Sequence, residues 1–173
     1  MGGGIPIGSL TLIEGDSQSG KSVLAQQMTW GSLSDGFQLS FFTTENTVKS
    51  LVKQMQSLNI DILNYLLLNK LRLYPMEFAR SKGEVLSTLL EGIIQEGQQG
   101  HGMIFIDALT PCLTNLVQET VLSFFEGLAK IPAILSALKL NPGWACASFR
   151  SIKRRDNREE HGTNGITFSQ KQP

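Results

Sequence analysis

The sequence predicts one α/β domain, built on a mostly parallel sheet with helices on both faces. Three observations support this prediction. Apolar runs of strand length alternate along the chain with longer stretches whose apolar residues recur at helical spacing, which is the pattern of strand–helix–strand units. The apolar runs are continuous rather than alternating, as expected for strands that are buried on both sides. A glycine-rich turn lies between the first apolar run and the first helical stretch.

Four apolar runs are expected to form strands, at residues 9–13, 37–44, 71–76 and 102–109. Each run leads into a stretch in which apolar residues recur three or four positions apart, the spacing that keeps them on one face of a helix. These helical stretches begin near Ser22, Val48, Val85 and Glu119. Strand and helix therefore alternate in the way that favours parallel strands joined by helical crossovers.

Composition places the chain among globular proteins. It has 173 residues, of which 41% are hydrophobic and 17% charged, enough for one domain with a core. The formal net charge is zero and no basic stripe runs through the first 140 residues, which argues against nucleic acid as the main partner. Two cysteines are too few for a disulfide scaffold, so a reducing cytoplasm is expected. No apolar run has membrane-spanning length and the N-terminus does not resemble a signal peptide, so we expect any membrane association to be through a partner.

The glycine-rich turn in IEGDSQSGKSVL fits the phosphate-binding spacing G-x-x-x-x-G-K-[ST]. Gly15 and Gly20 allow backbone dihedrals that a Cβ would hinder, and they let the backbone approach a polyphosphate. The amide groups of residues 17–22 would then form an anion cradle at the start of the following helix. Lys21 would reach the β- and γ-phosphates, and the Ser22 hydroxyl would bind Mg²⁺. The full candidate set is Gly15, Asp16, Ser17, Gln18, Ser19, Gly20, Lys21 and Ser22.

A surface loop that matches this spacing by accident is the alternative. With glycine at about 7% of residues, the four fixed positions would recur by chance in a chain of this size on the order of 1% of the time. The strand expected before the loop and the helix expected after it lower that chance further. Nucleotide binding is therefore the preferred interpretation.

The stretch MIFID ends an apolar strand in a carboxylate. At the carboxyl end of a strand beside the loop strand, Asp107 would hold Mg²⁺ through water and the Ser22 hydroxyl, which is the role of a Walker B aspartate. Many strands end in aspartate because it forms turns, so this motif is weak when taken alone. Its place about 85 residues after the phosphate-binding loop strengthens the assignment.

The stretch FFTTEN ends another apolar strand in a carboxylate, that of Glu45. A carboxylate at this place can act as a base on a water in line with the γ-phosphate. The same letters are also a capping sequence, in which Thr44 or Asn46 would satisfy free amide groups at a helix start. Spacing alone leaves both interpretations of this stretch open.

Three stretches carry a resemblance to a known family: GGGIPIGSLTLIEGDSQSGKSVLAQQMTWGSL, FFTTENTVKSLVKQMQSLNID and MIFIDALT. Together they resemble the KaiC/RecA-like ATPases and, within them, the ATP-binding proteins of the archaellum (the archaeal flagellum). The resemblance covers residues 2–130, about three-quarters of the chain. It implies a RecA-like P-loop NTPase core with the loop strand near the centre of the sheet.

The resemblance also implies a site and a setting. ATP and Mg²⁺ would be bound by residues 15–22 together with Asp107, and Glu45 would lie near the hydrolytic water. Proteins of this kind form rings on the cytoplasmic side of the archaellum motor, where they contact the hexameric motor ATPase and the membrane platform protein. Nucleotide binding matters there more than fast turnover, so at most a slow ATPase is implied.

After Lys130 the chain departs from that family. We expect a nucleotide-binding core at residues 1–130, an uncertain remainder of the core at 131–149, and a polar, disordered tail at 150–173. A RecA-like core needs one more strand, between the loop strand and the MIFID strand. Either AILSALKL or GWACASF has to fill that place, although prolines interrupt the segment. The change of character suggests a truncated or frameshifted reading frame.

Three functions remain open at this point. The first is an ATP-binding, weakly hydrolysing or non-hydrolysing, regulatory ATPase of the archaellum motor complex. The second is a RecA/RadA-type ATPase of DNA recombination or repair, against which the neutral net charge counts. The third is a truncated, inactive remnant that binds nothing tightly.

Overall fold

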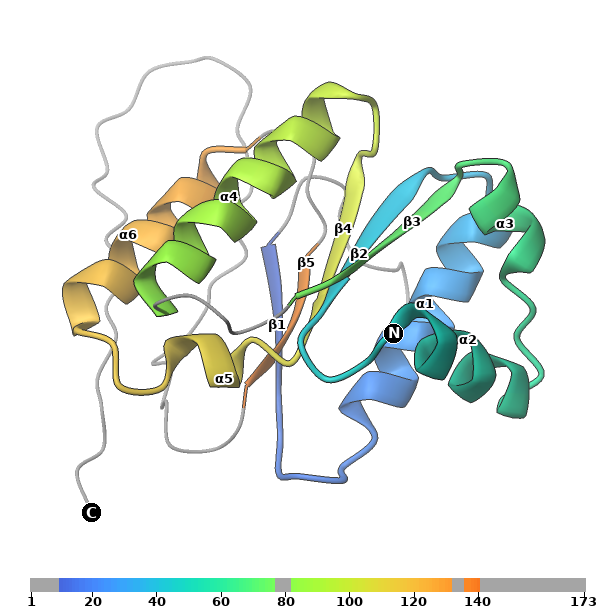
Figure 1. Cartoon of the computed structure of the whole chain (residues 1–173), viewed down its shortest axis with the longest axis horizontal. Helices are drawn as coiled ribbons and strands as arrows, with labels where there is room; N and C mark the ends of the chain where they lie inside the picture. The colour runs from blue at the N-terminus through green and yellow to red at the C-terminus, as the bar shows by residue number, and fades with distance from the viewer. Residues whose placement is uncertain (1–9, 77–81, 132–135, 141–173) are drawn as a thin grey trace, which may run out of the picture.

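A computed structural model describes residues 10–76, 82–131 and 136–140 of the chain. Within these residues a five-stranded sheet is covered by helices on both faces (Figure 1). All described strand pairs are parallel. The predicted α/β class, with a parallel sheet and helices on both sides, is confirmed.

Strands and helices alternate along most of the chain. The strands are β1 (Leu10–Glu14), β2 (Leu39–Thr43), β3 (Leu71–Pro75), β4 (Met103–Asp107) and β5 (Ser136–Leu140). The helices are α1 (Lys21–Ser34), α2 (Val48–Ser57), α3 (Leu63–Leu67), α4 (Lys82–Gln98), α5 (Thr110–Leu113) and α6 (Gln118–Ala129). The four strands expected from the apolar runs are all present, with ends that differ from the expected ones by a few residues at most.

The strand needed between β1 and β4 is β5. The order across the sheet is β1-β5-β4-β2-β3. Leu138 of β5 pairs with Leu12 of β1 on one side and with Ile106 of β4 on the other. Of the two segments considered from the sequence, AILSALKL supplies this strand, while GWACASF and the expected tail at 150–173 lie outside the described residues.

The position of β1 differs from the prediction that the loop strand lies near the centre of the sheet. Among the described strands β1 is at an edge, because β5, β4, β2 and β3 all lie on the same side of it. The prediction of a central β1 is therefore wrong for the part of the sheet that the structure describes. A central place would need a strand on the other side of β1, and no described residue pairs there.

Two apolar cores lie on the two faces of the sheet. Helices α1, α2 and α3 cover one face, and α4, α5 and α6 cover the other (Figure 1). Neighbouring residues of a strand point to opposite faces, and so Phe41 of β2 belongs to the first core while Phe42 belongs to the second. Phe41 stacks on Phe105 of β4 with ring centroids 6.2 Å apart. Strands β2 and β4 pair in parallel and are buried on both faces. Their carboxyl ends therefore lie next to each other, along the edge of the sheet where the strands end.

Candidate nucleotide-binding site

The loop between β1 and α1 has the backbone that the glycine spacing requires. Gly20 precedes the first residue of α1 with φ 86°, in the left-handed region that glycine adopts at little cost. Gln18 also lies in that region, with φ 64°. The Ser19 amide closes a turn on the Asp16 carbonyl at 3.2 Å. Residues 16–20 are exposed, so this turn is accessible to a ligand.

Gly15 packs closely against Ser19 inside this loop. A Cβ at position 15 would come within 2.8 Å of the Ser19 hydroxyl oxygen, so that hydroxyl would have to move. With glycine at position 15, the hydroxyl stays where it accepts a hydrogen bond from Lys21 at 3.2 Å.

The loop surrounds the ammonium group of Lys21. Its Nζ donates hydrogen bonds to the Gly15 carbonyl at 2.6 Å, to the Ser19 hydroxyl at 3.2 Å and to the Asp16 carbonyl. The side chain is only 6% exposed, so its charge is held inside the loop. A cation fixed within an exposed turn makes the loop attractive to an anion with several oxygens.

Ser22 and Asp107 meet although they are far apart in the sequence. The Ser22 hydroxyl donates to Oδ1 of Asp107 at 3.1 Å. Asp107 is the last residue of β4 and is 1% exposed. The structure thus brings the end of the loop and the end of the MIFID strand together at one edge of the sheet.

Glu45 lies at the same edge of the sheet, where it is placed by hydrogen bonds of the backbone and of the neighbouring threonines. It is exposed and follows β2 by two residues, and Thr43 at the end of β2 is the register partner of Asp107. The Thr43 hydroxyl accepts the amide of Glu45 at 3.3 Å, and the Thr44 hydroxyl donates to the Ala108 carbonyl at 2.7 Å. The backbone beside Glu45 is therefore fixed to the end of β4.

The capping alternative for TTEN places the cap on the wrong residue. Helix α2 begins at Val48, and its cap is Thr47, whose hydroxyl accepts the Ser50 amide at 3.2 Å. Neither Thr44 nor Asn46 caps α2, because the helix begins later in the chain than the sequence TTEN suggested. The Thr44 hydroxyl is used instead to join the ends of β2 and β4.

The residues at this edge fit a nucleotide phosphate and a divalent cation. Backbone amides and an ammonium are donors for phosphate oxygens, and a hydroxyl beside a carboxylate offers the oxygen ligands that Mg²⁺ prefers. These groups converge from β1, α1 and β4 within the contacts given above. The Ser22–Asp107 hydrogen bond thus brings the loop at 15–22 and Asp107 together, and Glu45 follows the end of β2, the strand that pairs with β4.

Comparison with known proteins gives the family. The family model described as "ATPase: KaiC" matches residues 1–131. The chain belongs to the KaiC-type ATPases. The expected KaiC/RecA-like membership is thereby confirmed.

Within the KaiC-type ATPases, this chain is similar to proteins named archaeal flagellar ATP-binding protein FlaH. It is 44% identical to the one from Methanococcus voltae in an alignment of 150 positions that covers 82% of this chain and 64% of that protein. It is 39% identical over 131 residues to the one from Sulfolobus acidocaldarius, covering 73% of this chain and 57% of that protein. The crystal structure of FlaH from Methanocaldococcus jannaschii superposes with a TM-score of 0.66 at 29% identity, covering 82% of this chain and 64% of the other. The chain spans about three-fifths of the length of these relatives.

A cavity on the other face of this KaiC-type chain is separate from the loop. It has a volume of about 360 Å³ and lies between α4 and strands β2 and β3. Its walls include Phe42, Tyr74, Met76 and Leu89, and none of the residues at 15–22 borders it. The candidate nucleotide site at residues 15–22 is therefore distinct from this cavity.

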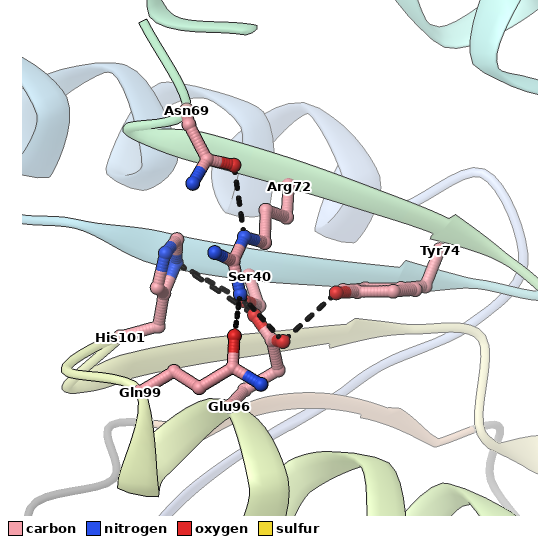
Figure 2. Close-up of polar contacts among 7 residues, drawn as sticks. All are labelled: Ser40, Asn69, Arg72, Tyr74, Glu96, Gln99 and His101. Atoms are coloured by element: carbon pink, nitrogen blue, oxygen red, sulfur yellow. Dashed lines mark hydrogen bonds and ion pairs between the residues drawn. The ribbon is translucent and has the colours of Figure 1, made fainter.

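A polar cluster around the buried carboxylate of Glu96 lies between strands β2 and β3 and the end of α4 (Figure 2). At its centre Oε1 of Glu96 accepts from Arg72 at 2.9 Å and from Tyr74 at 2.8 Å. The Ser40 hydroxyl donates to Oε2 of the same carboxylate, and Nδ1 of His101 lies 3.2 Å from the Ser40 oxygen. The cluster thus ties β2 and β3 to the end of α4.

The Ser40–His101 pair in this cluster does not form a nucleophile and its base. The one proton of the Ser40 hydroxyl is directed to Glu96, so Nδ1 of His101 has to be the donor to the Ser40 oxygen. Ser40 is 0% exposed and His101 1% exposed, which keeps substrate away from both. Sequence reasoning missed this cluster, although a serine and an arginine within otherwise apolar strands were a visible signal.

The Glu96 carboxylate should make stability depend on pH. Burial opposes its ionisation, but hydrogen bonds from Ser40, Tyr74 and Arg72 and the charge of Arg72 outweigh that effect, so the pKa of Glu96 lies below its ordinary value of 4.5. The ionised Glu96 carboxylate therefore contributes fully to the free energy of unfolding above about pH 4.5. This contribution is lost as the pH falls through the lower pKa that Glu96 has in the folded state. Urea unfolding from pH 7 to pH 3 should show this loss in the wild type.

In the Glu96→Gln variant, the free energy of unfolding should fall much less between pH 7 and pH 3 than in the wild type, because the glutamine side chain does not ionise. Glu91→Gln, an exposed glutamate on the same helix, is the matched control and should follow the wild type. Equal pH dependence in Glu96→Gln and the wild type would contradict the assignment.

Within the described ranges, no helix is both long enough and apolar enough to cross a membrane. The same residues hold no group of three or more His, Cys, Asp or Glu side chains that could bind a metal ion by themselves. A cation at the loop would therefore depend on ligand oxygens and water as well as on Ser22 and Asp107.

Proposed function

We propose that this chain binds ATP together with Mg²⁺ at the loop between β1 and α1. The observation that carries the proposal is the convergence of Lys21, Ser22 and Asp107: a buried ammonium inside the loop, and a hydroxyl 3.1 Å from a buried carboxylate at its end. ATP is the nucleotide named for the similar FlaH proteins. Their names and the family match support the choice of nucleotide.

Different residues of the loop and the strand ends would bind the phosphates, the cation and the water. Backbone amides of the exposed turn at residues 17–20 and the Lys21 ammonium would donate to the β- and γ-phosphates, with Lys21 exchanging its loop carbonyls for phosphate oxygens. Ser22 and Asp107 would hold Mg²⁺, directly and through water. Bound Mg²⁺ would neutralise phosphate charge. Glu45 would orient a water and accept its proton.

We further propose that the chain acts in the archaellum machinery, as a regulatory or assembly component rather than as a fast enzyme. The support is the similarity to three proteins named for the archaeal flagellum. Partners would be the archaellum motor ATPase and the membrane platform protein, met at the cytoplasmic side of the membrane. A homo-oligomeric ring is proposed for the full-length proteins. Hydrolysis would be slow at most.

Isothermal titration calorimetry with ATP, with and without Mg²⁺, tests the binding proposal. We expect Mg²⁺ to raise the affinity of the wild type for ATP. In Asp107→Asn, which keeps the size of the side chain, the affinity for Mg²⁺ should fall roughly 10–100-fold, the usual cost of losing an outer ligand. The increase caused by Mg²⁺ should therefore be largely lost.

Asp61→Asn is a suitable control, because Asp61 is exposed and an asparagine can still accept the Leu63 amide as Asp61 does at 3.0 Å. It should bind ATP as the wild type does. If the wild type gave no binding heat with ATP and Mg²⁺, the proposed function would be rejected.

A further inference from the structure

A pair of glutamines crosses between the loop helix and the next helix. Gln26 lies on α1, one turn after Ser22, and is 0% exposed. Its Nε2 donates to Oε1 of Gln54 on α2 at 3.0 Å. Its own Oε1 is buried and has no hydrogen-bond partner among the described residues. A buried amide that is only partly satisfied is costly, so this pair is an expensive way to join two helices.

Apolar packing already joins α1 and α2 without it. Ala25 of α1 and Leu51 and Met55 of α2 belong to the same core. Apolar contacts are not directional, whereas a hydrogen bond fixes distance and angle. The glutamine pair therefore adds a defined position of α2 along α1 that packing alone does not give.

The position of α2 bears on the proposed base. Glu45 stands two residues before the cap of α2, Thr47. On its other side the backbone is held to β2 and β4 through Thr43 and Thr44. The short segment between these two attachments carries Glu45, so a shift of α2 moves that segment relative to the loop.

We propose that Gln26 and Gln54 are positioning residues that couple the occupied phosphate loop to the segment carrying Glu45. Phosphate bound at Lys21 and Ser22 orders the first turns of α1. Gln26 lies on the next turn of that helix and passes the restraint to Gln54, which holds α2 and thereby Glu45. This coupling rests on the proposed nucleotide binding.

Hydrogen–deuterium exchange measured by mass spectrometry tests the coupling without relying on turnover. The probe is AMP-PNP with Mg²⁺, and two segments are compared: the loop at residues 15–22, and α2 at residues 48–57. In the wild type both should exchange more slowly with the probe bound. For α2 the expected slowing is roughly fivefold or more, the low end of coupling between two sites.

The Gln54→Met variant keeps the length of the side chain but removes the acceptor. Its loop should still be protected by AMP-PNP, while the protection of α2 should fall to near that of the free protein. Gln54→Glu, which retains an acceptor for Gln26, should restore it. Gln56→Met, at an exposed glutamine of the same helix, is the matched control and should behave as the wild type.

The outcomes separate the two proposals. Protection of α2 in Gln54→Met equal to that in the wild type would overturn the coupling, as would a wild type whose loop is protected and whose α2 is not. A wild-type loop that AMP-PNP leaves unprotected would overturn nucleotide binding itself, and the coupling with it.

Discussion

Replacing Lys21 by alanine is expected to lower the affinity for a fluorescent ATP analogue by a factor of at least about 100. A hydrogen bond to a charged group contributes about 1.5–3 kcal/mol, and two such bonds to phosphates correspond to roughly 10²–10⁴ in affinity. The loss should be large because the ammonium is held inside the loop and is 6% exposed, where solvent screens it little. Fluorescence titration of the purified variant measures it.

Lys21 also makes hydrogen bonds within the loop itself, so the test needs two controls. Its hydrogen bonds to the Gly15 carbonyl and the Ser19 hydroxyl would be lost together with the charge, and near-ultraviolet circular dichroism should show that the rest of the fold persists. Lys49→Ala removes an exposed lysine of α2 and should bind as the wild type does. Unchanged affinity in Lys21→Ala would reject the site assignment.

The second large effect concerns turnover: the purified chain should hold nucleotide weakly and release phosphate far more slowly than about 1 s⁻¹, the low end for phosphoryl-transfer enzymes. As the γ-phosphate leaves, catalysis needs positive charge beyond the P-loop lysine, often supplied by a neighbouring subunit. The contacts of the described residues place one ammonium in the loop, that of Lys21. Missing charge of this kind costs 10³–10⁵ in rate, about 4–7 kcal/mol of transition-state stabilisation.

A phosphate-release assay on the wild type beside Glu45→Gln measures this. Both should give rates near the background, while Glu126→Gln, at an exposed glutamate of α6, controls for the change of charge. Turnover on the order of 1 s⁻¹ that vanished only in Glu45→Gln would show that the chain is a competent enzyme by itself.

Local patterns allowed the phosphate loop and the strand ends to be predicted from the sequence. The spacing from Gly15 to Ser22 is a property of eight consecutive letters, and an apolar strand that ends in Asp107 is a property of five. Parallel strands bring their carboxyl ends to one edge of the sheet, and so the meeting of Ser22 and Asp107 could be expected before it was observed. The need for a strand between β1 and β4 came from the topology of the family.

Pairs that form across the fold could not be predicted in the same way. The contacts between Gln26 and Gln54, and between Ser40 and Glu96, join residues from different helices and strands whose spacing carries no signal. The capping interpretation of TTEN named Thr44 or Asn46, whereas the cap is Thr47, because threonine and asparagine both cap helices and the sequence does not show which of them precedes the first turn. Where the chain actually turns into α2 depends on Thr44 being held by the end of β4.

The place of β5 in the sheet has a consequence for how the chain is made. Leu10 of β1 pairs with Ser136 of β5, and the described strands give β1 no other neighbour. During synthesis at about 5–20 residues per second, β1 has to wait several seconds after it leaves the ribosome before β5 is made. Contacts between such distant parts of a chain also form slowly. Until they form, an unpaired apolar strand is open to other nascent chains, so the yield of folded protein should depend on chaperones and on the rate of translation.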